Sequence, residues 1–125
     1  MHPRVVNVRA PGARWDVYVG RGRCPSTGSY GKWGNPFTLT KNGPEAMRLF
    51  IDWLGETWDS PNPGLREAFR DRLTMQLEGR VLGCWCAPGP CHAEVLARLM
   101  DGEELSAIRV DMLRACGLAE EAPRG

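Results

Sequence analysis

The residues best suited to chemistry in this chain lie in one short stretch, residues 84–94. It holds three of the five cysteines and one of the two histidines. Thiolate and imidazole are the ligands that zinc prefers, and a thiol beside an imidazole is also the arrangement that activates a nucleophilic cysteine. The stretch therefore predicts either a metal centre or a reactive thiol pocket.

The first alternative is a metal centre with four ligands. The candidate ligands are Cys84, Cys86, Cys91 and His92. Their types suit zinc, and three thiolates with one open position could instead hold an iron–sulfur cluster, which we favour less. The spacing C-x-C-x4-C-H is not that of a usual zinc finger, and adjacent residues on a helix point about 100° apart. The four side chains can therefore meet at one metal ion only if the first turn of the helix is irregular. The sequence alone does not establish a cofactor.

The second alternative is a catalytic pocket without metal. Cys91 at a helix N-terminus would have its thiolate favoured by the helix dipole, and His92 could act as acid or base. Glu94 is a candidate general acid or base, or the carboxylate that stabilises an oxocarbenium-like centre at a ribose. These three candidate catalytic residues predict a nucleotide-processing hydrolase or transferase, for example one that cleaves an N-glycosidic bond.

The third alternative assigns no chemistry to the stretch. Small thiols fill core space well, His92 could cap its own helix, and Glu94 could simply favour the positive end of the helix dipole. The protein would then be a non-catalytic binding module for a nucleotide or a nucleic acid.

A strand followed by a helix must position these side chains. Val81 and Leu82 begin an alternating segment that predicts a buried strand near 80–86, which the turn residues 87–90 then break. Apolar residues at helical spacing predict a helix over 91–100. The carboxyl end of a strand and the N-terminus of the next helix form the edge where open α/β sheets bind ligands.

The rest of the chain predicts one small α/β domain with a short central sheet. With 125 residues and 42% hydrophobic composition, the chain is long enough for a single core. Further strands are expected near 4–9 and 15–20, with the two pairing as a hairpin, and further helices near 44–58, 63–77 and 105–116. We expect residues 1–100 to form the α/β domain and residues 101–125 to form a helical extension with a frayed tail.

Positive charge is concentrated in the first third of the chain. The net charge is +1, but residues 1–41 hold seven Lys and Arg against one acid, and the remainder is net negative. This asymmetry predicts a phosphate-bearing partner, a nucleotide in the first place and nucleic acid in the second. The plain alternative is a solvated basic surface.

Two short motifs in this basic third are candidates for substrate binding. Glycines and arginines alternate over 20–23, directly after a predicted strand, and residues 32–37 combine a cation, two aromatic rings and a turn. Guanidinium and ammonium groups would neutralise phosphate, an indole would stack on a base and an amide would bond to base or sugar. A surface turn and a rigid core corner are the alternatives. The candidate substrate-binding residues are Tyr18, Arg21, Lys32, Trp33 and Asn35.

Three blocks of the sequence together resemble a known family. They are residues 18–21, 32–37 and 81–97. The pattern WGNPF followed by CWCxPxxCH and an acidic residue is similar to that of small bacterial and phage proteins catalogued as a domain of unknown function, over about residues 4–100. The resemblance implies an α/β fold and points to the motif residues, but it implies no reaction. The loop between Arg21 and Lys32 is longer than the family's usual connection, so Cys24 inherits no family role.

Nothing in the sequence predicts a membrane or export segment. The chain has no apolar run of about 18 residues, and its first four residues, MHPR, lack the apolar core of a signal peptide. We therefore expect a cytoplasmic protein with no membrane partner and with reduced cysteines. The sequence does not decide the oligomeric state.

Overall fold

Three strands and four helices make up the part of the chain described by the structure, a computed structural model. The described residues are 4–20, 45–84 and 91–118. The elements are β1 (Arg4–Asn7), β2 (Val17–Tyr18), α2 (Glu45–Trp58), α3 (Pro63–Leu77), β3 (Val81–Cys84), α4 (His92–Met100) and α5 (Leu105–Ala115). The predicted α/β class and single small domain are confirmed.

The sheet has the strand order β1-β3-β2, and both neighbours of β3 run parallel to it. The predicted hairpin of the first two strands is therefore wrong, because β3 is inserted between them and a hairpin would be antiparallel. Asp16 fixes the start of β2 on β3: its backbone N–H donates to the Val81 carbonyl at 2.7 Å, and its carboxylate accepts from the Val81 N–H at 2.8 Å.

The two faces of the sheet carry different clusters, as the two-residue period of a strand requires. Leu82 and Cys84 belong to the main core on the helical side, whereas Tyr18 packs with Val8 and Trp15 in a small cluster on the other side. Gly83 lies under this small cluster. A Cβ at Gly83 would lie 2.7 Å from Trp15 Cγ, so the close packing of the indole on β3 requires a glycine.

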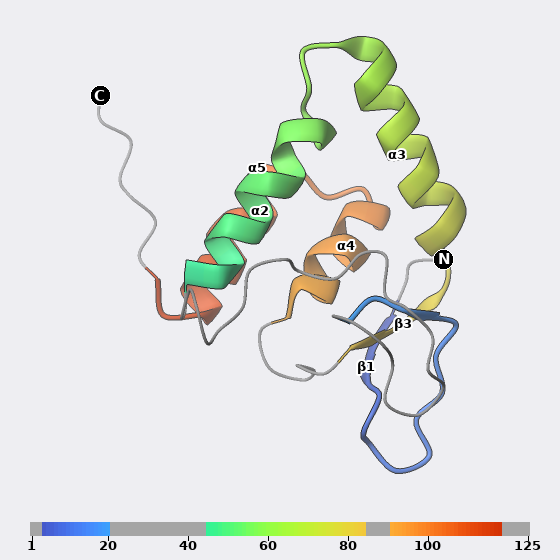
Figure 1. Ribbon diagram of the computed structural model, residues 1–125. Coiled ribbons are helices and arrows are strands. Elements are labelled where there is room, and N and C mark those ends of the chain that lie inside the picture. The colour runs from blue at the N-terminus through green and yellow to red at the C-terminus, as the bar shows by residue number, and fades with distance from the viewer. Residues whose placement is uncertain (1–3, 21–44, 85–90, 119–125) are drawn as a thin grey trace.

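Helix α4 is the central helix of the domain. It contacts β1 and β3 on one side and α2, α3 and α5 on the other, and Figure 1 shows it between the sheet and the outer helices. Its buried residues lie almost all around the helix axis: His92, Ala93, Val95, Leu96, Ala97 and Leu99. The predicted helix is thus surrounded by the other elements of the fold.

Helices α2 and α3 complete the outer layer. The apolar stripe of α2 is buried against the core, and α3 begins at the N-cap Asn62, whose side chain accepts from two backbone N–H groups. Leu73 and Leu77 of α3 are fully buried and Phe69 packs partly buried on the core, but Leu65 is 59% exposed, so the start of this helix lies away from the core.

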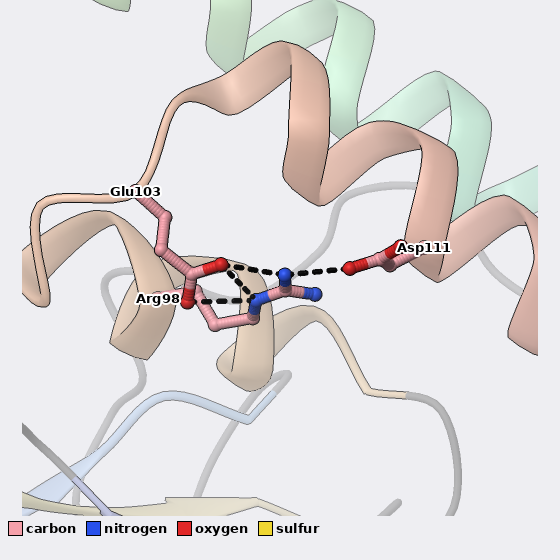
Figure 2. A network of polar contacts seen from close by, with 3 residues as sticks. All are labelled: Arg98, Glu103 and Asp111. Atoms are coloured by element: carbon pink, nitrogen blue, oxygen red, sulfur yellow. Dashed lines mark hydrogen bonds and ion pairs between the residues drawn. The ribbon is translucent and has the colours of Figure 1, made fainter.

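Helix α5 shares the core of the preceding elements. Its residues Leu105, Ile108, Met112 and Leu113 are buried, and it contacts both α2 and α4. Arg98 of α4 donates to both carboxylate oxygens of Glu103 and to Asp111 of α5, at 2.6–3.0 Å (Figure 2). This network attaches α5 and the turn before it to α4. Residues 119–125 of the expected tail lie outside the described residues.

Candidate functional site

The candidate site is built where β3 ends and α4 begins. Cys84 is the last residue of β3, and Cys91 is the N-cap of α4, with the extended dihedrals φ −140° and ψ 139°. Cys91 therefore lies one residue before the first helical turn in which we expected it. Its Sγ accepts a hydrogen bond from the Ala93 N–H at 3.4 Å. A thiolate at this position is stabilised by the helix N-terminus.

The sulfurs of Cys84 and Cys91 are in direct contact. Their Sγ atoms are 2.9 Å apart, and the two residues are 0% and 2% exposed. Neither forms a disulfide. Two thiolates on one tetrahedral zinc, each about 2.3 Å from the metal, would lie about 3.8 Å apart. The observed spacing is shorter than the edge of a zinc tetrahedron and longer than a disulfide bond of about 2.05 Å.

His92 is held by a backbone carbonyl. Its Nε2 lies 2.6 Å from the Val19 oxygen, and the residue is buried. A carbonyl oxygen only accepts, so Nε2 carries the hydrogen and, in the neutral ring, Nδ1 is the acceptor. Nδ1 lies 3.8 Å from Cys91 Sγ. The imidazole is thus oriented to take the proton of the Cys91 thiol.

The aromatic ring of Phe50 fixes the plane of this imidazole from α2. The two rings meet edge to face, with centroids 5.3 Å apart and an interplanar angle of 76°. This geometry is favourable for an aromatic pair and restricts rotation of the histidine ring. The contact with Val19, just after β2, sets the tautomer, and the contact with Phe50 of α2 helps to set the direction of Nδ1.

The contact between His92 and Val19 also brings two strand ends together. Val19 follows β2, and its N–H donates to the Gly83 carbonyl of β3 at 2.9 Å. The carboxyl ends of β2 and β3 and the N-terminus of α4 thus meet at one edge of the sheet. In the sequence, Gly20 and then Arg21 follow directly.

Glu94 differs from its two candidate catalytic neighbours in exposure. It lies in the first turn of α4 with its side chain exposed, whereas Cys91 and His92 are buried. The N-terminus of α4, with its N-cap, therefore presents a carboxylate to solvent on one side and a thiol and imidazole to the core on the other.

Tyr18 lies on the other face of the sheet from Cys84. It is 5% exposed, and its ring packs so closely over Gly20 that a Cβ there would lie 2.5 Å from ring atoms. Its cluster contains Val8 and Trp15 and is separate from the core cluster that holds the two thiols. Its predicted role in substrate binding remains a prediction.

The other predicted site residues lie outside the described residues. They are Arg21, Lys32, Trp33, Asn35 and Cys86. Within residues 4–20, 45–84 and 91–118, no three His, Cys, Asp or Glu side chains form a group that could hold a metal ion. In the same ranges, no helix is long and apolar enough to cross a membrane. The zinc and iron–sulfur alternatives both need Cys86 and remain predictions.

Two partners of the site were not found by sequence reasoning. The Val19 carbonyl carries no side-chain signal, and nothing in the predicted helix near 44–58 marks Phe50 as the partner of a histidine. The sequence analysis also did not predict a direct contact between Cys84 and Cys91, because it placed both among the four candidate metal ligands. A backbone acceptor for a histidine depends on tertiary structure and leaves no local pattern.

Comparison with known proteins gives a match to a family model. Residues 6–102 match the model of a family described as a domain of unknown function (DUF4326). No curated protein matches the chain. No solved structure matches it either. The matched range contains all the blocks on which the resemblance was based, and it includes every candidate site residue.

Proposed function

The chain belongs to this family of unknown function, and we propose that it binds and processes a nucleotide or nucleoside phosphate at the carboxyl edge of its sheet. The reaction is that of a hydrolase or transferase, such as cleavage of an N-glycosidic bond. The observation that supports it best is the contact of His92 with Val19. This contact joins the strand that leads into the basic segment to the helix start that carries the reactive side chains.

The topology supports a ligand at this edge. Ligands of open parallel sheets bind outside the carboxyl ends of the strands, beside helix N-termini. Here β3 is the central strand and α4 starts from its carboxyl end, while β2 leads towards Arg21 in the sequence. The proposed phosphate ligands are Arg21 and Lys32, and Trp33 and Asn35 are proposed to hold the base or sugar.

The exposure of the side chains divides the proposed roles. Glu94 is the exposed group, so we assign it the general acid or base that acts on the substrate, or the carboxylate that stabilises charge at the ribose. Cys91 and His92 form a nucleophile and base pair, with the imidazole Nδ1 taking the thiol proton. Because Cys91 is 2% exposed, substrate attack by its sulfur requires an opening on binding.

The test is incubation of the full-length protein with a panel of nucleosides and nucleoside mono-, di- and triphosphates. Released base, sugar phosphate or phosphate is measured by chromatography, and binding by calorimetry. We expect Glu94→Gln to lower turnover by about 10² to 10⁴-fold. The matched control is Glu104→Gln, an exposed glutamate at the start of α5 without a side-chain cap bond.

The outcomes separate binding from catalysis. Absence of both binding and release over the whole panel would reject the proposal. Binding without release would leave the non-catalytic module, and release that is unchanged in Glu94→Gln would remove the role of that carboxylate. Equal losses in Glu94→Gln and Glu104→Gln would point to a general charge effect instead of a site.

A further inference from the structure

We propose that Cys84 and Cys91 are a redox-active dithiol that closes to a reversible disulfide. Cys91 is the thiol that reacts first with a hydroperoxide, and Cys84 is the thiol that resolves the product. The inference concerns a modification of the protein itself and does not depend on the proposed nucleotide chemistry.

The distance between the sulfurs is the first support. The two Sγ atoms lie 2.9 Å apart, and a disulfide bond is about 2.05 Å long. Closure therefore requires an approach of less than about 1 Å between two atoms that already touch. One sulfur is at the end of a strand and the other at the N-cap of a helix, so the pair is set by two packed elements.

The surroundings of Cys91 are the second support, because they favour its thiolate. Its Sγ accepts from the Ala93 N–H at the helix N-terminus, and the acceptor nitrogen of His92 lies 3.8 Å away. Both the helix terminus and a neighbouring imidazole lower the energy of a thiolate, which is the form that attacks a peroxide. These contacts make Cys91 the first thiol to react.

The chemistry is balanced by the two thiols and one hydroperoxide. His92 Nδ1 takes the Cys91 proton, and the thiolate attacks one peroxide oxygen. The O–O bond breaks, so that Cys91 becomes a sulfenic acid and an alcohol or water leaves with the proton. The Cys84 sulfur, losing its own proton, then attacks the Cys91 sulfur, and the S–O bond breaks to release water. Two electrons pass from the thiols to the peroxide, and a thiol reductant reverses the step.

Cys116 provides an internal comparison. It is the third cysteine among the described residues, it is partly buried, and burial raises the pKa of its thiol. It also lies at the C-cap of α5, where the helix dipole disfavours a negative charge. Cys116 is therefore not expected to form the sulfenic acid under conditions that oxidise Cys91.

The burial of both thiols limits the choice of oxidant for the test. Cys84 is 0% and Cys91 2% exposed, so a bulky oxidant is excluded and hydrogen peroxide is chosen as the smallest hydroperoxide. The full-length reduced protein is treated in the presence of a chelator, which removes bound metal as a competing explanation. Remaining thiols are then alkylated under denaturing conditions, and the intact mass is measured before and after addition of dithiothreitol.

The link is located in a Cys86→Ser variant. Chymotrypsin cuts after Trp85, which separates Cys84 from Cys91 in the sequence, so a disulfide between them keeps two peptides together. We expect the wild-type protein, Cys86→Ser and Cys116→Ser each to lose two hydrogens and to regain them on reduction. In Cys84→Ser we expect a sulfenic acid at Cys91, trapped by dimedone.

Several results would overturn the proposal. They are the absence of a mass change in wild-type protein, the absence of a link between Cys84 and Cys91 from the Cys86→Ser peptide map, or sulfenic acid at Cys84 in Cys91→Ser. Circular dichroism checks that each serine variant is folded. If Cys84→Ser or Cys91→Ser does not fold, the mass of the wild-type protein and the peptide map of Cys86→Ser still test the proposal. Both of these proteins retain Cys84 and Cys91.

Discussion

The imidazole of His92 and the backbone carbonyl of Val19 are joined by a hydrogen bond of 2.6 Å between residues that are 73 positions apart in the chain. This bond ties the first turn of α4 to the end of β2. It also determines which imidazole nitrogen faces Cys91, because the nitrogen that donates to Val19 cannot accept. One contact thus serves both the packing of the central helix and the chemistry of its N-cap.

His92→Ala is expected to destabilise the protein by about 2–4 kcal/mol, because it leaves the buried Val19 carbonyl without its donor and removes the ring packed on Phe50. Urea unfolding measures the loss. Glu94→Ala, an exposed position in the same helical turn, is the control and is expected to change the free energy of unfolding by about 0.5 kcal/mol or less. Equal effects of the two substitutions would contradict the role of the buried bond.

Gly83→Ala is expected to cost about 1–3 kcal/mol of stability, since a Cβ there would lie 2.7 Å from both Trp15 Cγ and Val8 Cγ1. The displaced indole should also change the near-ultraviolet circular dichroism. Gly64→Ala in the first turn of α3 is the matched control, because the nearest atom to its Cβ would be Asn62 Oδ1 at 3.4 Å. A Gly83→Ala protein as stable as this control would show that Trp15 does not hold its place on β3.

Acid should weaken the attachment of α5 through Glu103. Hydrogen bonds from the Arg98 guanidinium hold the pKa of this carboxyl below its ordinary value of 4.5. Because the folded pKa is lowered, the stabilisation is fully present above 4.5 and is lost as the pH falls through the folded value. Glu103 is partly exposed, so solvent screening limits the contribution to less than about 1 kcal/mol.

Glu103→Gln tests this linkage. The variant should be less stable than the wild-type protein at neutral pH, and the difference should shrink below pH 4.5, where the wild-type carboxyl becomes protonated. Urea unfolding at a series of pH values gives both curves. A difference that stays constant from neutral to acid pH would mean that the charge of Glu103 does not contribute.

Burial of the thiol pair should protect it from large reagents. In a Cys24→Ser, Cys86→Ser background, a polyethylene glycol maleimide should label Cys116 within the folded protein but leave Cys84 and Cys91 unlabelled, since these are 0% and 2% exposed. All three should react in denaturant, as a gel shift would show. Rapid native labelling of Cys91 would mean that the N-cap of α4 is open in solution.

The local pattern of the chain was enough to predict its helices and its class. Apolar residues at helical spacing, the turn before Pro63 and the N-cap Asn62 define α3 at the bounds that the sequence predicted, and the other three helices differ by one residue at one end. These features depend on residues a few positions apart, so they can be read from the sequence. The family motifs also predicted the matched range closely.

Tertiary structure alone decided the strand pairing and the contacts of the site. A parallel sheet with β3 in the middle joins segments more than sixty positions apart, and neither the hydrophobic period nor a turn signal specifies which strands pair over that separation. The same holds for the contact of Cys84 with Cys91 and for the carbonyl that orients His92. The sequence determined which side chains are available at the end of β3, and packing determined which atoms meet there, because burial and hydrogen bonding act between neighbours in space.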